Sequence, residues 1–430
     1  MTEKNRQRMA RALFALCLIF AIDQNSIIKA QIVEWDDCER FLGNVSYGST
    51  PSSWLEYWNQ VTPENGGKWG SVERTRDVMD WADLDIAYAL AKDNDLLFKQ
   101  HVFVWGNQQP SWIEDLSEAE QLEEIEEWIM EMCTRYPETD MIEVVNEPVN
   151  DPPDEAGNGG GNYMEALGGR GVTGYDWIIT AFELAKEHCP NAALIINEYN
   201  VLNVTGVRNN YLNIIDLLIE RDLLDAIGVQ AHEFSVFPMQ ADAITSSLDD
   251  LAEKDLPIYV TELDIGSGDN NQPIDDQVQL EAYQRIFPAL WNHRAVYGVT
   301  LWGYQPGMWR STAYLENADG SDRPAFEWMK NYISRNNSKC DGVTSAYSEL
   351  EKPYQFSFYP NPVTDKTITL SSKEFITTIT IRNIGGKIIQ RIFPDINRQS
   401  LTINLDANSG VYLIEVKGRN YTEVQRIVIK

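Results

Sequence analysis

Eight alternations of strand-like and helix-like segments between residues 41 and 334 constrain the fold of this chain more than any other feature. Short apolar runs alternate with longer amphipathic stretches, at roughly 36 residues per repeat, the pattern of βα units. Eight such units predict an α/β fold, a (β/α)8 TIM barrel, whereas a doubly wound open sheet, the alternative, seldom carries so many. The expected strands are Phe41–Val45, Asn59–Thr62, Leu96–Trp105, Met141–Asn146, Ala193–Asn197, Ala226–Gln230, Pro257–Leu263 and Tyr297–Trp302. The helical patterns between them include Glu118–Arg135, Tyr175–His188, Asn210–Arg221, Asp242–Lys254 and Asp276–His293.

Composition divides the 430 residues into four parts. Residues 1–30 read as a secretory signal peptide, because basic residues precede a short apolar run, Ala12–Ile22, and the small residue Ala30 precedes Gln31. That run is too short to span a bilayer and no later stretch reaches its length, so a soluble, exported protein without a membrane span is expected. Residues 31–340 form the expected barrel domain, 341–353 a polar linker and 354–430 a small β-rich domain.

The formal net charge of −30 is unevenly spread. Residues 1–30 hold five basic and two acidic residues, and residues 353–430 hold ten basic and six acidic ones, so the acidic excess lies in the barrel. This charge argues against nucleic acid and anionic membranes as partners. It suits a soluble protein that acts on a neutral or basic polymer. The protein is expected to be a monomer.

Four cysteines remain once Cys17 leaves with the signal peptide, which permits two disulfides in an exported chain and three ways of pairing. Cys38 precedes the first strand and Cys340 follows the last helix, so barrel closure is expected to bring these two together. Cys133 and Cys189 end helices of neighbouring repeats and form the expected second pair. None has zinc-site spacing, and His232-Glu233 does not continue as His-Glu-x-x-His, so no metal and no cofactor are predicted.

Polar residues gather where the expected strands end, which is where TIM barrels carry their chemistry. The fourth strand runs into Asn146-Glu147-Pro148, and the proline ends it directly after the carboxyl group. The seventh strand carries Glu262 near its end. A carboxyl group at the mouth of a barrel is partly desolvated, and its raised pKa suits a general acid. Other strand ends contribute Glu64, Asn65, Lys68, Trp69, His101, Trp105, Gln230, His232, Asp264 and Trp302.

Two glutamates on opposed strands, among amides and indoles, suit glycoside hydrolysis. One carboxylic acid protonates the leaving oxygen, and the other carboxylate meets the developing oxocarbenium carbon. Asn146 and Gln230 are candidates to bind sugar hydroxyls or the nucleophile, and His232 is a candidate to hold Glu262 ionised. Asp264 is expected to be a buried structural residue. Flat faces for pyranose rings are expected from Trp69, Trp105, Trp302 and Trp309.

Two further patterns are interpreted as structural. Gly169-x-Gly171-x-x-Gly174 matches a dinucleotide-binding motif by letter, but it follows a loop rich in Gly and Asn rather than a strand. Asn197-Glu198 repeats the Asn-Glu pair on the fifth strand. It is expected to be a structural or supporting pair rather than a second catalytic acid.

The order and spacing of these residues resemble glycoside hydrolase family 10, the endo-β-1,4-xylanases, over about residues 40–335. The matching segments are Val61–Asn65 with Lys68-Trp69, His101–Trp105 with Gln108–Trp112, Val144–Glu147, Gln230–His232, Thr261–Asp264, Trp302-Gly303 and Arg323–Phe326. The resemblance implies retaining hydrolysis of xylan, with Glu147 as acid/base and Glu262 as nucleophile. It implies substrate contacts on the glycone side from Glu64, Asn65, Lys68, His101, Trp105, Asn146, Gln230, His232, Trp302 and Trp309.

Three features depart from the family pattern. Gly106 stands where the family usually has a second histidine, after the tryptophan of the third strand. Gln305–Met308 makes the interval between Trp302 and Trp309 one residue shorter than the common spacing, and the loop 151–171 after Glu147 looks longer than usual. A related barrel glycosidase that acts on another β-glycan therefore stays an alternative, as does a non-catalytic glycan-binding surface protein.

The C-terminal part is expected to be a β-sandwich of about 75 residues, with a turn at residues 383–386. Its expected strands are Phe356–Tyr359, Thr367–Ser371, Thr377–Ile381, Lys387–Ile392, Leu401–Leu405, Val411–Lys417 and Glu423–Lys430. Tyr359–Pro362, Ser409–Leu413 and Arg426–Lys430 resemble the C-terminal sorting domain of the Bacteroidetes type IX secretion system. This implies the type IX machinery as a partner and a secreted or surface-attached location. A carbohydrate-binding module is the alternative, but a row of exposed aromatics is not evident, because Phe393 and Tyr412 are expected in the core.

Overall fold

The computed structural model describes residues 40–47, 53–156, 161–267, 275–335, 356–360, 363–364, 366–383, 386–394, 398–418 and 422–430. The expected signal peptide and linker lie outside the described residues. So do Cys38 and Cys340, and the bridge between them stays a prediction.

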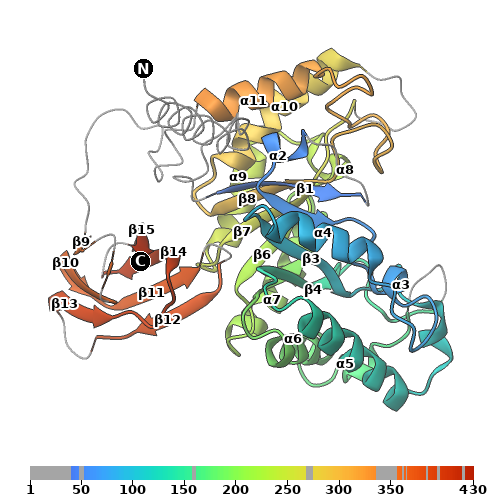
Figure 1. The fold of residues 1–430 in the computed structure, drawn as a ribbon, viewed down its shortest axis with the longest axis horizontal. Coiled ribbons are helices and arrows are strands. Elements are labelled where there is room, and N and C mark those ends of the chain that lie inside the picture. The colour runs from blue at the N-terminus through green and yellow to red at the C-terminus, as the bar shows by residue number, and fades with distance from the viewer. Residues whose placement is uncertain are drawn as a thin grey trace, which may run out of the picture.

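Eight parallel strands form a closed barrel in sequence order, which confirms the predicted fold (Figure 1). β1 pairs with both β2 and β8, so no strand is left at an edge. Every strand lies within one residue of its expected limits, because each is a short apolar run ended by polar or turn residues. The strands are β1 (Phe41–Ser46), β2 (Gln60–Pro63), β3 (Leu97–Val104), β4 (Met141–Asn146), β5 (Ala193–Asn197), β6 (Ala226–Val229), β7 (Ile258–Leu263) and β8 (Val296–Leu301).

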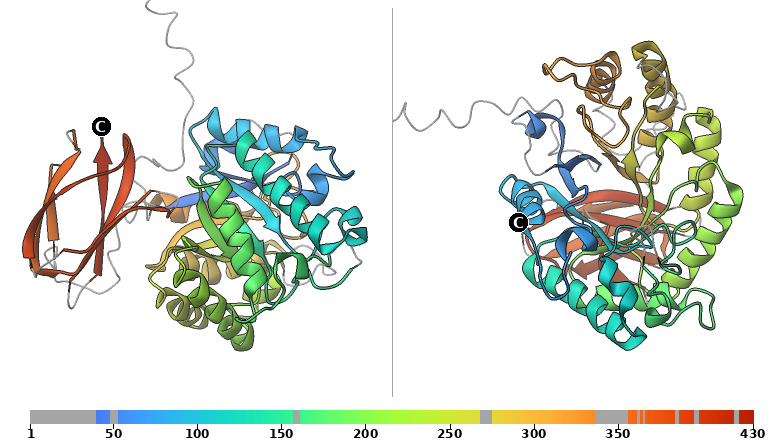
Figure 2. Two further views of the ribbon diagram at one scale, coloured as in Figure 1. Left: turned by 90° about the horizontal axis from the view of Figure 1, so that it is seen from below. Right: turned by 90° about the vertical axis from the view of Figure 1, so that its right-hand side faces the viewer.

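Helices cover the outside of the barrel (Figure 2). α5 begins at a capping box made by Ser117 and Glu120, and it buries Ile125, Ile129 and Met132 against the strands. α7 begins five residues before its expected start, because its first two residues, Thr205 and Gly206, are exposed and have low helix propensity. The α-helices of the barrel domain are α2 (Trp54–Tyr57), α3 (Trp69–Val72), α4 (Ala82–Lys92), α5 (Glu118–Arg135), α6 (Asp176–His188), α7 (Thr205–Ile219), α8 (Glu233–Val236), α9 (Ala241–Ala252), α10 (Asp276–Trp291) and α11 (Pro324–Arg335).

A disulfide joins the end of α5 to the end of α6. It links Cys133 to Cys189, whose Cα atoms are 5.3 Å apart. The expected second pair is therefore confirmed.

The C-terminal residues form two antiparallel sheets, with strand orders β13-β10-β9 and β12-β11-β14-β15. Apolar residues of both sheets, such as Leu370, Ile381 and Ile414, share one core, as predicted for a sandwich. The expected core position of Phe393 is wrong: this residue follows the end of β12 and is 67% exposed. The strands are β9 (Phe356–Tyr359), β10 (Thr367–Ile376), β11 (Thr378–Asn383), β12 (Ile388–Ile392), β13 (Arg398–Asn404), β14 (Gly410–Lys417) and β15 (Thr422–Ile429).

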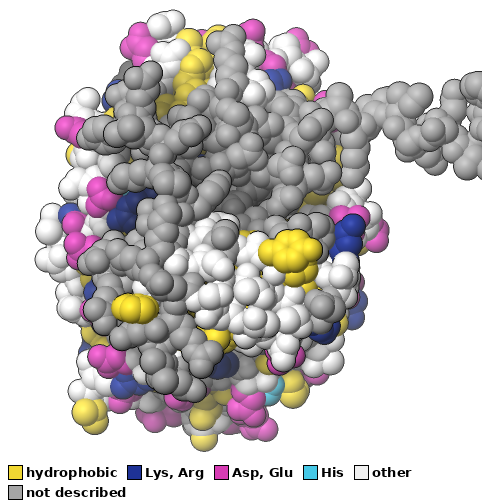
Figure 3. Space-filling view, turned by 90° about the vertical axis from the view of Figure 1, so that its left-hand side faces the viewer, with side chains coloured by type: hydrophobic (Ala, Val, Ile, Leu, Met, Phe, Trp, Pro, Cys, Tyr) yellow, Lys and Arg dark blue, Asp and Glu magenta, His cyan; other side chains and the backbone are white. Residues whose placement is uncertain are grey.

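The sandwich contacts the barrel where the barrel strands begin. Lys417 forms an ion pair with Asp255, just before β7, and the backbone amide of Ile388 donates a hydrogen bond to Asp225, just before β6. The opposite, carboxyl ends of the strands carry Glu147 and Glu262, so these contacts leave that rim clear. On the face shown in Figure 3, the hydrophobic side chains of the described residues form separate patches rather than a continuous row.

Candidate active site

Glu147 and Glu262 lie at the carboxyl ends of β4 and β7, and both are buried. The backbone of Glu147 is left-handed, with φ of 55°, a conformation that is costly for a residue with a side chain. The amide of Glu147 donates to the carbonyl of Asn197 at 2.8 Å, which ties the end of β4 to β5. Strain of this kind persists where surrounding bonds over-determine the position.

The Glu147 carboxyl group is held by two side-chain donors. Gln230 Nε2 donates to Oε1 at 2.8 Å, and Trp105 Nε1 donates to Oε2 at 2.7 Å. Burial, with a smaller contribution from the charge of Glu262, raises the pKa of Glu147 to about 8, against the opposing effect of the Gln230 bond. Glu147 therefore carries a proton at neutral pH.

The Glu262 carboxylate has the opposite character. Asn197 Nδ2 donates to Oε1 at 2.8 Å, and His232 Nε2 lies 3.2 Å from Oε2. Burial alone would raise its pKa, but the His232 bond and the nearby positive charges lower it to about 2. Glu262 therefore stays ionised, as the sequence predicted for a carboxylate beside His232.

His232 is held as a cation by a second carboxylate. Its Nδ1 lies 2.8 Å from Asp264 Oδ2, and the amide of Glu233 donates to Asp264 Oδ1 at 2.7 Å. Burial would lower the pKa of His232, but Asp264 and Glu262 raise it to about 10. Asp264 is 1% exposed, which confirms the expected buried residue.

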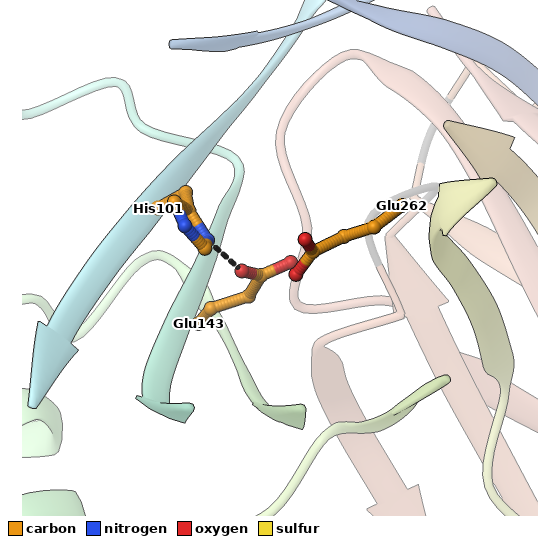
Figure 4. Close-up of side chains that lie close together, drawn as sticks. All are labelled: His101, Glu143 and Glu262. Atoms are coloured by element: carbon orange, nitrogen blue, oxygen red, sulfur yellow. Dashed lines mark hydrogen bonds and ion pairs between the residues drawn. The ribbon is translucent and has the colours of Figure 1, made fainter. Parts of the chain in front are cut away.

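A second ion-pair group lies beneath Glu262, in the barrel interior. Figure 4 shows His101 and Glu143 pointing toward Glu262, with His101 Nδ1 2.5 Å from Glu143 Oε2. Lys99 forms an ion pair with the other oxygen of Glu143. His101, Glu143 and Glu262 could converge on a metal ion, but the Lys99 ammonium already offsets the charge of Glu143. Sequence reasoning missed Lys99 and Glu143, although a charged residue within each apolar strand was the available signal.

Lys68 lies after β2, at the N-cap of α3, and is the centre of a polar group. Its Nζ donates to Asn65 Oδ1 at 2.9 Å and to Gln108 Oε1 at 2.5 Å, and it lies 5.3 Å from the centre of the Trp105 ring. Burial lowers the pKa of Lys68 and raises that of nearby Glu64. The structure thus brings together four of the predicted residues, Glu64, Asn65, Lys68 and Trp105. Gln108, which begins a segment that matches the family pattern but was given no site role, is the fifth.

Three of the four predicted tryptophan platforms lie at the rim. The Trp302 ring is 5.0 Å from the His101 ring, and the Trp309 ring is 4.6 Å from the His232 ring and 53% exposed. Trp105 reaches Glu147 directly. The prediction for Trp69 is wrong: it is 1% exposed, because it starts α3 and packs against Trp128 of α5 in the core.

The second Asn-Glu pair supports the site from β5. Asn197 Nδ2 contacts both Glu262 and Asn146 Oδ1, the latter at 2.9 Å. Glu198 accepts bonds from the amide of Val149 and from Asn150 Nδ2, both at 2.8 Å, so it anchors the chain after Glu147. The pair is a supporting one, as expected, although Asn197 reaches a predicted catalytic group directly.

A barrel with one protonated and one ionised glutamate on facing strands, beside two buried indole rings and the exposed ring of Trp309, defines a glycoside hydrolase of the (β/α)8 class. Residues 37–332 match the profile of Glycosyl hydrolase family 10, and the chain belongs to this family. Residues 357–430 match the profile described as Secretion system C-terminal sorting domain, which marks the chain for export.

Named relatives agree with this assignment. The chain is 41% identical over 301 residues to Endo-1,4-beta-xylanase B of Cellvibrio japonicus, a match that covers 69% of this chain and 46% of that protein. It is 31% identical over 259 residues to Endo-1,4-beta-xylanase B of Thermotoga neapolitana, covering 57% and 70%. The fold is shared with native xylanase 10B from Thermotoga maritima, at a TM-score of 0.60 and 23% identity over 73% of this chain and 100% of that one. Within the described residues, no helix is long and apolar enough to cross a membrane.

Proposed function

We propose that this chain is an exported, retaining endo-β-1,4-xylanase that cleaves internal xylosidic bonds of xylan. The observation that carries the proposal is the opposite protonation of two facing carboxyl groups, with the pKa of Glu147 raised to about 8 and that of Glu262 lowered to about 2. The similarity to two proteins named as endo-1,4-beta-xylanases supports xylan as the substrate. No step needs a metal or cofactor.

In the first step, Glu262 attacks the anomeric carbon as nucleophile. The bond from that carbon to the glycosidic oxygen breaks, and Glu147 gives its proton to the leaving oxygen. The product is a glycosyl ester on Glu262 and a shortened xylan chain with a new hydroxyl group. Asn197 and His232 hold the Glu262 oxygens in place for this attack.

In the second step, Glu147 acts as the base. The negative charge of Glu262 contributes to the raised pKa of Glu147. Forming the ester removes that charge, so the carboxylate form of Glu147 is more stable in the second step than in the first. It takes a proton from water, the water oxygen attacks the anomeric carbon, and Glu262 leaves as a carboxylate. Two inversions retain the configuration.

The glycone sugars lie over the ends of β2, β3 and β8 in this proposal. Trp302 and Trp309 provide faces for the rings, and polar groups bind the hydroxyls. The residues proposed for this role are Glu64, Asn65, Lys68, His101, Trp105, Asn146, Gln230, His232, Trp302 and Trp309.

The C-terminal domain is proposed to act as the address for the type IX secretion machinery, after removal of a signal peptide within residues 1–30. The enzyme is then released or held at the cell surface, and it acts as a monomer. The match of residues 357–430 to a secretion sorting profile supports this role.

The deciding experiment is reducing-end release from a panel of β-glycans, with Glu262→Ala as the inactive control. We expect rapid release from xylan, a product of retained configuration by NMR, and little release from β-glucan. Faster release from another β-glycan would favour the related-glycosidase alternative. Binding to xylan without release would favour a glycan-binding protein.

A further inference from the structure

We propose that Asp151 determines specificity on the leaving-group side of the cleft, where its carboxylate accepts hydrogen bonds from hydroxyls of the leaving sugar. This inference rests on the proposed hydrolase function and extends it to a segment of the chain outside the predicted site. It is carried by the contacts that place Asp151 beside the proton donor.

Asp151 lies one turn of chain beyond Glu147. Its backbone amide donates to the carbonyl oxygen of Glu147 at 2.8 Å, so the position of one residue fixes that of the other. Glu198 anchors the intervening Val149 and Asn150 at 2.8 Å each. Asp151 is therefore held by a buried support, which gives its side chain a defined place.

Gly106 allows the loop to take this position. Its amide donates to the carbonyl of Asp151 at 3.0 Å. A Cβ at residue 106 would lie 2.2 Å from that same oxygen and 2.3 Å from the carbonyl oxygen of Pro152. Both contacts are with backbone, so any side chain at residue 106 would displace the loop. The loop can therefore follow this path only because residue 106 has no side chain.

Tyr199 orients the Asp151 side chain. The phenol donates to Asp151 Oδ2 at 2.9 Å, and burial together with this carboxylate raises the pKa of Tyr199, so the donor proton is retained. The Tyr199 ring packs edge-on against Phe234, whose centre is 5.8 Å away and which is 42% exposed. A carboxylate has about four acceptor positions, and one bond from Tyr199 leaves capacity for sugar hydroxyls. Asp151 is half-buried and so is within reach of a ligand.

The positions of Asp151, Tyr199 and Phe234 on the rim assign these residues to the side of the cleft that binds the leaving group. The Lys68 group, Trp105 and Trp302 follow β2, β3 and β8, where the glycone is proposed to bind. Asp151, Tyr199 and Phe234 follow β4, β5 and β6, which form the other half of the rim. Glu147, the proton donor to the leaving oxygen, lies at the border of that half. The leaving sugar therefore faces Asp151.

Two substrates separate this role from a structural one. Xylohexaose places a xylose in the leaving-group position, whereas phenyl β-xylobioside places an aryl group there that still needs the proton from Glu147 but cannot donate hydrogen bonds to Asp151. For Asp151→Ala, we expect kcat/KM on xylohexaose to fall about tenfold or more, as for loss of a charge-assisted bond. On the aryl xylobioside, kcat/KM of Asp151→Ala should stay within about twofold of the wild-type value, since no such bond is lost.

Asp154→Asn is the matched control, because Asp154 lies in the same loop, is exposed and pairs with Arg170 at 3.3 Å. It should leave both substrates unaffected. Gly106→Ala should lower kcat/KM on both substrates, because the displaced loop is bonded to the backbone of Glu147. Equal losses of Asp151→Ala on both substrates, or no loss on either, would overturn the proposal. A wild-type enzyme that cleaves neither substrate would instead refute the proposed function.

Discussion

Replacing Glu147 by Gln should stabilise the folded protein at alkaline pH while abolishing xylan hydrolysis. The pKa of Glu147 is raised from 4.5 to about 8, so the folded state binds this proton more tightly than the unfolded state. Stability must then fall as pH rises from the unfolded value toward the folded one. An uncharged glutamine of similar size avoids the burial of a carboxylate and removes this dependence.

The size of the effect follows from the two pKa values. At 1.36 kcal/mol per pKa unit, ionisation of the wild-type carboxyl group lowers the free energy of unfolding by ~1 kcal/mol at pH 5 and by ~4 kcal/mol at pH 8. Both values are relative to a pH at which Glu147 is protonated in the folded and the unfolded state. Glu147→Gln should therefore gain about 3 kcal/mol over the wild type between these two pH values. The difference between pH values cancels any effect of the substitution that does not depend on pH.

The assay is urea unfolding of both proteins at pH 5 and pH 8, followed by tryptophan fluorescence. Glu155→Gln serves as a control, because Glu155 is exposed in the following loop and its replacement should change stability little. A stability difference between Glu147→Gln and the wild type that is the same at both pH values would refute the assigned protonation of Glu147.

Four further outcomes are expected. Glu262→Gly should lose xylan hydrolysis by orders of magnitude and recover turnover of an activated xyloside with azide, giving a glycosyl azide of inverted configuration; near-normal activity would remove Glu262 as nucleophile. His232→Asn should move the acid limb of the kcat/KM pH profile upward, because the pKa of Glu262 then loses the bond that lowers it; an unmoved limb would contradict this. Cys133→Ser with Cys189→Ser should lower the unfolding free energy by at most about 4 kcal/mol in chemical unfolding, and unchanged stability would show that the bridge contributes nothing. A chain ending near residue 341 should keep its turnover on soluble xylan and most of its melting temperature, since the Lys417–Asp255 pair and the Ile388–Asp225 bond are together worth roughly 2 kcal/mol. Selective loss on insoluble xylan by that truncated chain, with normal export, would indicate a binding module.

The barrel fold, and the pair Glu147 and Glu262 at the centre of its site, could be predicted from the sequence for one physical reason. The spacing of apolar runs sets the order of strands and helices, and eight parallel βα units have one closed solution. Closure brings all strand ends to one rim, so Glu147, Glu262, His232 and Asp264 could be placed together without knowing any distance. The same logic paired Cys133 with Cys189.

Side-chain environments depended on contacts between distant segments. Trp69 reads like the other rim indoles, yet packing of α3 on α5 buries it. Glu143 meets Lys99 and His101 only because β3 and β4 face one interior. The bond from Gly106 to Asp151 joins positions 45 residues apart, and neither residue alone signals it.

The sequence by itself therefore determined the architecture and which carboxyl groups share the rim, because these follow from local patterns repeated along the chain. The sequence named His232 as a candidate to hold Glu262 ionised, but only the tertiary structure shows the burial and the contacts that separate the pKa values of the two carboxyl groups. That difference depends on burial and on the nearest charges: Glu262 lies against the His232 cation, whereas Glu147 is held by the neutral donors Gln230 and Trp105.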